Sequence, residues 1–206
     1  ATSVPCWPQV GKSAGRRGTL ARFTSAPLRP ADFPTCGQQG TLVAPLFSPE
    51  LVWDATGGRV AVTTGTAYVI DLYEEGNRVR SVRRDVPPRP VTREMALRHV
   101  GDGVHFGAVD CTIPPAEAVR GYGYGEVLPG VEAVSLSPEG EVWALRGRVA
   151  DEPGRTDVFG SDGAYLGTLP PGSPFPAAFL PEGRIVAVET DSLDVPVVAV
   201  YRVIRP

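Results

Sequence analysis

The chain has 206 residues and a formal net charge of −3, and hydrophobic residues make up 42% of it. These values indicate a globular chain of one domain or two small ones and exclude a disordered chain. No apolar run is long enough to span a membrane, and the overall charge gives no bias towards nucleic acid.

The composition favours short strands joined by turns. The chain holds 24 glycines and 22 prolines, a proportion typical of many tight connections. Cys6, Cys36 and Cys111 show neither metal-ligand spacing nor a disulfide framework, but they leave room for one bridge. Because the chain starts at Ala1 and has no recognisable signal peptide, we expect a processed chain or a piece of a longer one.

Residues 1–40 are interpreted as an irregular N-terminal segment. Only Gly18–Thr24 resembles a strand in its pattern. Within this segment, "GKSAG" around Ser13 matches the Gly-x-Ser-x-Gly pattern of a hydrolase nucleophile, which requires a turn from a strand into a helix. The flanking residues support neither element, so we interpret Ser13 as part of a loop.

The first repeated unit follows Thr41. In "LVWDATGGRVAVTTGTAYVIDLYEEGNRVRSV" apolar and polar residues alternate, and glycine-rich turns separate the predicted strands. The unit continues into a basic run of seven arginines and two acids: Arg78, Arg80, Arg83, Arg84, Asp85, Arg89, Arg93, Glu94 and Arg98. A nucleic-acid surface would interleave aromatic residues here, so we interpret the run as a solvated outer strand.

An insertion at about residues 87–103 interrupts the repeats. Its prolines end the preceding strand, and Thr92 is placed to cap a short helix from Arg93 to His99. His99 and His105 lie near Asp110 and Cys111, but their spacing supports neither a metal site nor a Cys–His pair. The following "GYGYGE" (Gly121–Glu126) lacks the features of a phosphate loop and is predicted to be a mobile loop.

Two further units repeat the first. The cores Gly58–Val62, Gly140–Leu145 and Gly183–Val188 align, and the last two are 43 residues apart, about the period of a four-stranded propeller blade. Asp71 and Asp157 recur at equivalent positions, which we interpret as a structural hydrogen bond to a neighbouring turn. The one asparagine, Asn77, lies in a predicted turn, so the acids do not indicate a calcium site.

The repeats predict an all-β fold, a partial β-propeller of about three four-stranded blades with one short helical insertion. Residues 41–206 would form this domain, and residues 1–40 would contribute one strand of a preceding blade. Matching apolar positions should face the cores between blades. They are Trp53, Val60, Val62, Leu72, Val142, Leu145, Phe159, Ile185, Val188 and Tyr201.

The stretches Leu51–Thr92 and Val158–Val203 resemble the C-terminal half of bacterial six-bladed β-propeller proteins of NHL-like type. The resemblance covers roughly Thr41 to Pro206. It implies an exported, periplasmic or extracellular protein, and it supplies no catalytic residue. The family has about six blades and this chain has material for three, so the resemblance implies an N-terminally truncated fragment or another means of ring closure.

The residues alone do not identify a function. They favour a non-enzymatic binding or scaffold propeller of the bacterial cell envelope, with a protein or small-molecule ligand and self-association through open blade faces. The alternative is a propeller hydrolase or lactonase-like enzyme with a site in the central channel. We predict no catalytic, metal-binding or cofactor-binding residue, and no nucleic-acid partner.

Overall fold

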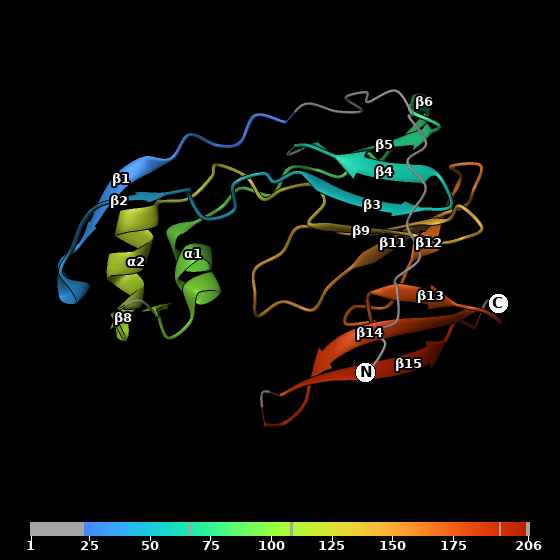
Figure 1. Cartoon of the computed structure of the whole chain (residues 1–206). Coiled ribbons are helices and arrows are strands. Elements are labelled where there is room, and N and C mark those ends of the chain that lie inside the picture. Colours follow the sequence, from blue (N-terminus) through green and yellow to red (C-terminus); the bar gives the residue numbers. More distant parts are fainter. Residues whose placement is uncertain (1–22, 66, 108, 194, 205–206) are drawn as a thin grey trace, which may run out of the picture.

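The computed structural model describes residues 23–204 except 66, 108 and 194. Three antiparallel sheets are stacked at one side of the molecule, and two helices with two short hairpins lie at the other (Figure 1). The predicted strand at Gly18–Thr24 lies mostly outside the described residues.

The first sheet is a four-stranded meander in chain order. Its strands are β3 (Val52–Thr56), β4 (Arg59–Thr63), β5 (Val69–Glu74) and β6 (Asn77–Arg83). Successive side chains of a strand point to opposite faces of the sheet, and residues paired across neighbouring strands point to the same face. Ala61 pairs with Leu72, and Ile70 pairs with Val82. These residues form the face that packs on the second sheet.

The second sheet is a four-stranded meander of the same order and lies between the other two. Its strands are β9 (Ala133–Leu136), β10 (Val142–Leu145), β11 (Thr156–Phe159) and β12 (Tyr165–Thr168). Val142 and Phe159 pack on the first sheet, whereas Trp143 and Val158 pack on the third. Because both faces are covered, every residue of β10 and β11 is buried.

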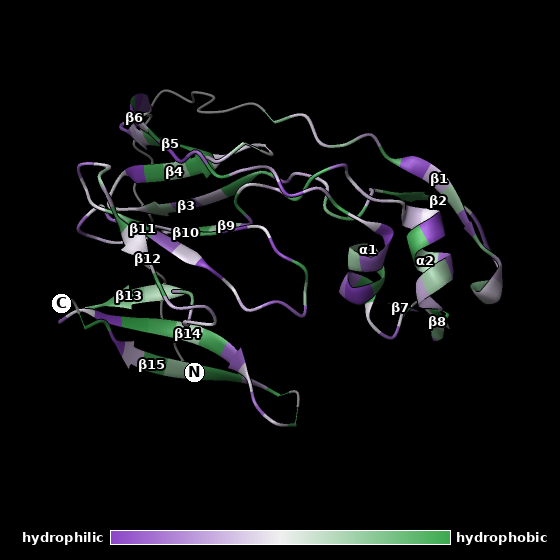
Figure 2. Ribbon diagram, turned by 180° about the vertical axis from the view of Figure 1, so that it is seen from behind, coloured by the Kyte–Doolittle hydropathy of each residue, from purple (hydrophilic) through white to green (hydrophobic). Residues whose placement is uncertain are grey.

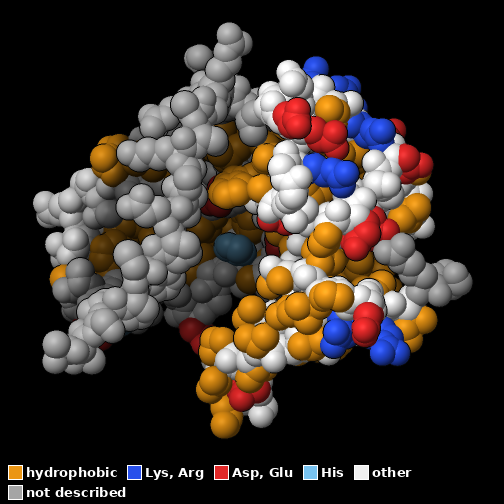
Figure 3. All heavy atoms as spheres, turned by 45° about the vertical axis from the view of Figure 1, so that its right-hand side comes forward, with side chains coloured by type: hydrophobic (Ala, Val, Ile, Leu, Met, Phe, Trp, Pro, Cys, Tyr) orange, Lys and Arg blue, Asp and Glu red, His pale blue; other side chains and the backbone are white. Residues whose placement is uncertain are grey.

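The third sheet has three strands among the described residues. They are β13 (Ala178–Leu180), β14 (Arg184–Thr190) and β15 (Pro196–Arg202). Ile185 and Ala187 are buried towards the second sheet, whereas Val188, Val198 and Val200 on the opposite face are 61%, 72% and 57% exposed. We call this opposite side the open face. Figure 2 shows the hydrophobic character of β14, and Figure 3 shows hydrophobic side chains gathered in the lower part of the molecule.

Residues 29–43 and 93–124 form a separate helical unit. Its elements are β1 (Arg29–Phe33), the 3₁₀ helix η1 (Pro34–Cys36), β2 (Gln38–Val43), α1 (Arg93–Val100), β7 (Val104–Phe106), β8 (Cys111–Ile113) and α2 (Pro115–Tyr122). The predicted helix over residues 93–99 is confirmed as α1. Thr92 caps it, because its side-chain oxygen accepts a hydrogen bond from the Met95 amide at 3.2 Å.

The second helix corrects the prediction of a single short helical insertion. Pro115 occupies the first turn of α2, where a missing amide costs no helical hydrogen bond. Gly121, predicted to lie in a mobile loop, is in this helix. A Cβ at this position would lie 2.2 Å from the Phe33 ring, so glycine is required for close packing rather than for flexibility.

A disulfide joins Cys36 to Cys111 across 75 residues of chain. It ties η1 to β8 beside the small core of the helical unit, which contains Phe33, Ile113 and Ala118. The buried Glu117 accepts hydrogen bonds from the amide and hydroxyl of Thr35 at 3.1 and 2.5 Å. The unit is therefore held by a covalent link and a polar contact in addition to its core.

Over residues 23–204 the structure is thus mostly antiparallel β, with two α-helices, and none of the described sheets closes into a ring. Among the predicted core residues, Val62, Val142, Leu145, Phe159 and Ile185 are buried. The prediction is wrong for Trp53 and Val188, which are 62% and 61% exposed. Trp53 is on the edge strand β3, and Val188 lies on the open face of the third sheet, so their matching repeat positions do not bury them.

Candidate functional site

A cavity of about 930 Å³ lies where the ends of the first two sheets approach α1. Four segments line it: residues 67–68 before β5, 84–89 after β6, 127–130 before β9, and the β10–β11 connection. Its volume is in the range of small-molecule sites. We call it the arginine pocket after the five arginines in its lining, Arg84, Arg89, Arg146, Arg148 and Arg155.

The fully buried carboxylate of Asp157 lies beneath this pocket. Arg146 donates to it from Nε at 2.9 Å and from Nη2 at 2.8 Å, and Arg84 donates from Nη1 at 2.7 Å. Burial opposes ionisation of Asp157, but these hydrogen bonds and one from Thr168 outweigh it and lower its pKa to about 2. The carboxylate therefore joins the first sheet, through Arg84, to the second.

Tyr68 lies beside this cluster and lines the pocket. Its side chain is 5% exposed, and its hydroxyl has no hydrogen-bond partner of good geometry, although Asp157 is near enough to affect it. Burial first, and then the Asp157 carboxylate, raise the pKa of Tyr68 above its ordinary value. The phenol therefore stays protonated at neutral pH and remains a hydrogen-bond donor.

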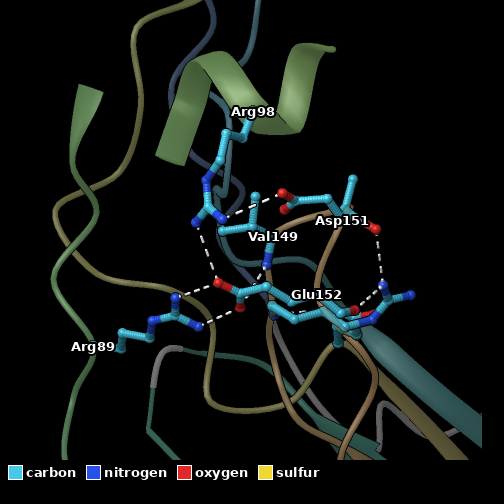
Figure 4. Close-up of polar contacts among 8 residues, drawn as sticks. Arg89, Arg98, Val149, Asp151 and Glu152 are labelled. Carbon is cyan, nitrogen blue, oxygen red and sulfur yellow. Dashed lines mark hydrogen bonds and ion pairs between the residues drawn. The ribbon is translucent and has the colours of Figure 1, made fainter. Parts of the chain in front are cut away.

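A second cluster forms around Glu152 (Figure 4). Arg89 binds both oxygens of this carboxylate, and Arg98 of α1 reaches Glu152 at 3.3 Å and Asp151 at 3.2 Å. The hydrogen bond from Arg89 is the main reason that the pKa of Glu152 falls to about 2. Figure 4 shows the two guanidinium groups converging on one carboxylate, which fixes the β10–β11 connection against α1.

The remaining two arginines of the lining differ in their partners. Glu132 accepts from the Arg148 amide at 3.1 Å and pairs with Arg148 Nε at 3.1 Å, while burial raises the pKa of Glu132. Arg155 is exposed and has no side-chain hydrogen bond or ion pair within the described part of the chain. It is therefore the one arginine of this lining whose guanidinium is unengaged among the described residues.

The histidines do not form a site with Cys111. Cys111 is bound in the disulfide, so no thiol is available for a Cys–His pair. His105 Nε2 lies 3.8 Å from Asp110, and both side chains are exposed. His99 packs on the ring of Phe47, with 4.5 Å between ring centres; burial and then Arg148 lower its pKa. Ser13 lies outside the described residues.

The basic run is more engaged than a solvated strand would be. Arg84 and Arg89 bind acids of the second sheet and its loop, and Arg80 donates to the Ser161 carbonyl at 3.0 Å. The recurring aspartates also differ from prediction. Asp157 contacts arginines of two sheets rather than a turn, whereas Asp71 accepts from Ser81 on the neighbouring strand.

Sequence reasoning missed most of the pocket. It considered Arg84 and Arg89 only as surface charges, and it did not single out Tyr68, Glu152 or Arg155. One signal for the pocket was present in the sequence. Arg146 and Arg148 precede a proline-containing connection and Arg155 follows it, so arginines lie at both ends of one hairpin loop.

A smaller groove of about 380 Å³ lies where strands of the three sheets converge. Its lining includes Trp53, Ser135, Phe175 and Val188. The groove is lined mainly by apolar side chains and carries one acidic residue, Asp54, whose Oδ2 is already engaged by the Leu136 amide at 2.7 Å. This contact joins β3 to β9 and leaves the groove without a cluster of charged groups.

Within the described part of the chain, no group of three or more His, Cys, Asp or Glu side chains is placed to hold a metal ion. None of the described helices is long and apolar enough to cross a membrane. Comparison of the chain with protein-family models and with curated protein sequences gives no match.

Proposed function

We propose that this chain is a non-enzymatic binding protein built as a stack of propeller-type blades, and that the arginine pocket is its ligand site. The observation that carries the proposal is a cavity of about 930 Å³ with a fixed charged lining. The ion pairs of Asp157 and Glu152 hold its walls in place before any ligand arrives, which reduces the ordering cost of binding.

The stacking of the sheets supports the propeller interpretation. The second sheet packs one face on the first sheet and the other on the third, as a blade inside a propeller does. The order of strands within the first two sheets is the same. The similarity of Leu51–Thr92 and Val158–Val203 to NHL-like propellers points the same way, and under this proposal each sheet is one blade.

The disulfide supports an exported protein of the cell envelope. Bridges such as Cys36–Cys111 form and persist in oxidising compartments and are rare in the cytosol. The open face of the third sheet supports an additional scaffold role, because exposed apolar surfaces of this kind mark association sites.

The test is a ligand screen by two-dimensional NMR on the whole chain, repeated on a pocket-filling variant. Ala67 is exposed and lines the pocket, so Ala67→Trp should occupy the cavity while leaving the cores intact. Ala116→Trp, on the exposed side of α2, is the matched control. We expect ligands that shift resonances of the pocket in the wild type and the control, and lose binding in Ala67→Trp.

Two outcomes would contradict the proposal. Ligands that bind Ala67→Trp as well as the wild type would place the site elsewhere. Hydrolysis of chromogenic esters or lactones that Ala67→Trp abolishes would make the protein an enzyme of the hydrolase or lactonase class instead.

A further inference from the structure

The charges around the arginine pocket do not balance. Four acids lie in its lining or directly behind it: Asp85, Glu132, Glu152 and Asp157. Against the five arginines they leave one net positive charge. A single negative charge on a ligand would neutralise this excess, whereas a dianion would reverse it.

Four of the five arginines of the lining already hold a carboxylate, and Arg155 is the exception among the described residues. Arg84 and Arg146 share Asp157, Arg89 binds Glu152, and Arg148 binds Glu132. A guanidinium that already holds a carboxylate has fewer donors for a ligand, but Arg155 keeps its full fork of N–H groups among the described residues. The backbone fixes its position, because the Arg155 carbonyl accepts from the Arg146 amide at 3.0 Å.

Tyr68 is a second polar group of the lining, and its hydroxyl is buried in the wall of the same cavity. Burial, and then a hydrogen bond to the Asp157 carboxylate, raise the pKa of Tyr68, so this donor is directed at Asp157. Arg155 is therefore the charged donor of the lining that has no partner among the described residues.

The rest of the lining is largely apolar. Val86, Pro87, Pro88, Val127, Leu128 and Pro129 contribute to its walls. Proline and valine surfaces favour contact with an apolar body and offer no side-chain donor or acceptor. The cavity thus combines an apolar wall with one unengaged cationic group.

We infer that the arginine pocket takes an organic monocarboxylate, whose carboxylate binds Arg155 and whose apolar body lies against the proline-rich wall. This inference rests on the proposed function and specifies its ligand class. Arginine binds a carboxylate through two parallel N–H groups, and such charge-assisted hydrogen bonds are the stronger kind.

The experiment uses three probes with one apolar body: 4-(2-naphthyl)butanoate, its primary amide, and the corresponding phosphonate. Calorimetric titration of the whole chain should give at least about tenfold tighter binding of the carboxylate than of the amide, because a hydrogen bond to a charged group contributes about 1.5 kcal/mol or more. Ala67→Trp should abolish binding of the carboxylate and of the amide.

Arg155→Gln should reduce the preference for the carboxylate over the amide to about one, while Arg155→Lys should retain part of it. Arg202→Gln is the matched control, since Arg202 is an exposed arginine of β15 outside the pocket lining. Because Arg155 is exposed and its side chain has no partner among the described residues, its substitution should leave the melting temperature unchanged, and circular dichroism checks this.

Equal affinity for the carboxylate and the amide, with both blocked by Ala67→Trp, would overturn the monocarboxylate inference and leave the proposed binding function standing. Tighter binding of the phosphonate would overturn it in favour of a dianion. A preference that survives in Arg155→Gln would overturn the role of Arg155. If none of the probes binds up to its solubility limit, the inference fails, and the ligand screen decides the proposed function separately.

Discussion

At the scale of single residues, Asp157 links the first two sheets and shapes the floor of the pocket. Its carboxylate is fully buried and accepts from Arg84 and Arg146, whose side chains are 24% and 22% exposed. Burial of one acid between two arginines is tolerated only because hydrogen bonds occupy its oxygens. A neutral residue here would leave two cations facing each other.

Asp157→Asn should therefore lower the free energy of unfolding by about 3 kcal/mol, the typical cost of removing one partner of a buried ion pair. Chemical denaturation at neutral pH measures the loss. Asp102→Asn, at an exposed carboxylate with no hydrogen bond or ion pair among the described residues, is the control and should change stability little. A loss as small as that of the control would show that the cluster contributes nothing to stability.

The same residue should make the protein sensitive to acid. The pKa of Asp157 is lowered in the folded protein, so its stabilising contribution is complete above its unfolded pKa, near 4, and disappears as the pH falls towards 2. A pKa of about 2 corresponds to about 2 kcal/mol of stability. The advantage of the wild type over Asp157→Asn should shrink by about 2 kcal/mol as the pH falls from 4 to 2, and a constant difference across this interval would contradict the assignment.

At the scale of elements, α1 depends on its first turn. Thr92→Ala removes the side-chain acceptor for the Met95 amide and should cost about 1 kcal/mol. Thr92→Ser keeps the acceptor and should cost much less. Thermal melts of the two variants give the comparison, and equal losses would mean that the cap does not stabilise the helix.

The helical unit should depend on its disulfide. Its core is small, and the bridge closes a loop of 75 residues, so replacing Cys36 and Cys111 by serine should cost about 4 kcal/mol in the loop-entropy picture. We expect faster hydrogen exchange in α2, β7 and β8, with β10 and β11 unchanged because the flanking sheets bury them. The reference protein and the variant without the disulfide both carry Cys6→Ser, so that no other thiol contributes. Uniformly faster exchange would instead mean that the whole chain unfolds as one unit.

At the scale of the whole molecule, the open face of the third sheet should drive association. Its exposed valines lie in one row across β14 and β15, since Val188 pairs with Val198. Sedimentation velocity should show the chain associating as its concentration rises, and Val198→Glu should shift it towards monomer because a charge in an apolar interface is costly. Val79→Glu, on β6 of the first sheet, is the control. A wild type that stays monomeric at all concentrations would contradict this prediction.

Much of the β architecture could be predicted from the sequence, because a strand's pattern is local. Alternating residues and glycine turns indicated the sheets, and Thr92 before a run of helix formers indicated α1. The same logic failed for α2, where Gly121, which allows close packing against Phe33, has the same appearance in sequence as a glycine of a loop. It failed for Trp53 and Val188 because burial depends on what covers a face, and the repeat pattern does not specify this.

The sequence by itself determined the strands, their order within each repeat and the first helix, because these follow from residue periods of two and from local capping. Only the tertiary structure decided which residues form the pocket. Arg84 and Asp157 are 73 residues apart, and Arg89 and Glu152 are 63 residues apart, and no local rule couples such positions. The stacking of one sheet on another brings them together, and the pairing of every other arginine leaves Arg155 unengaged in the lining.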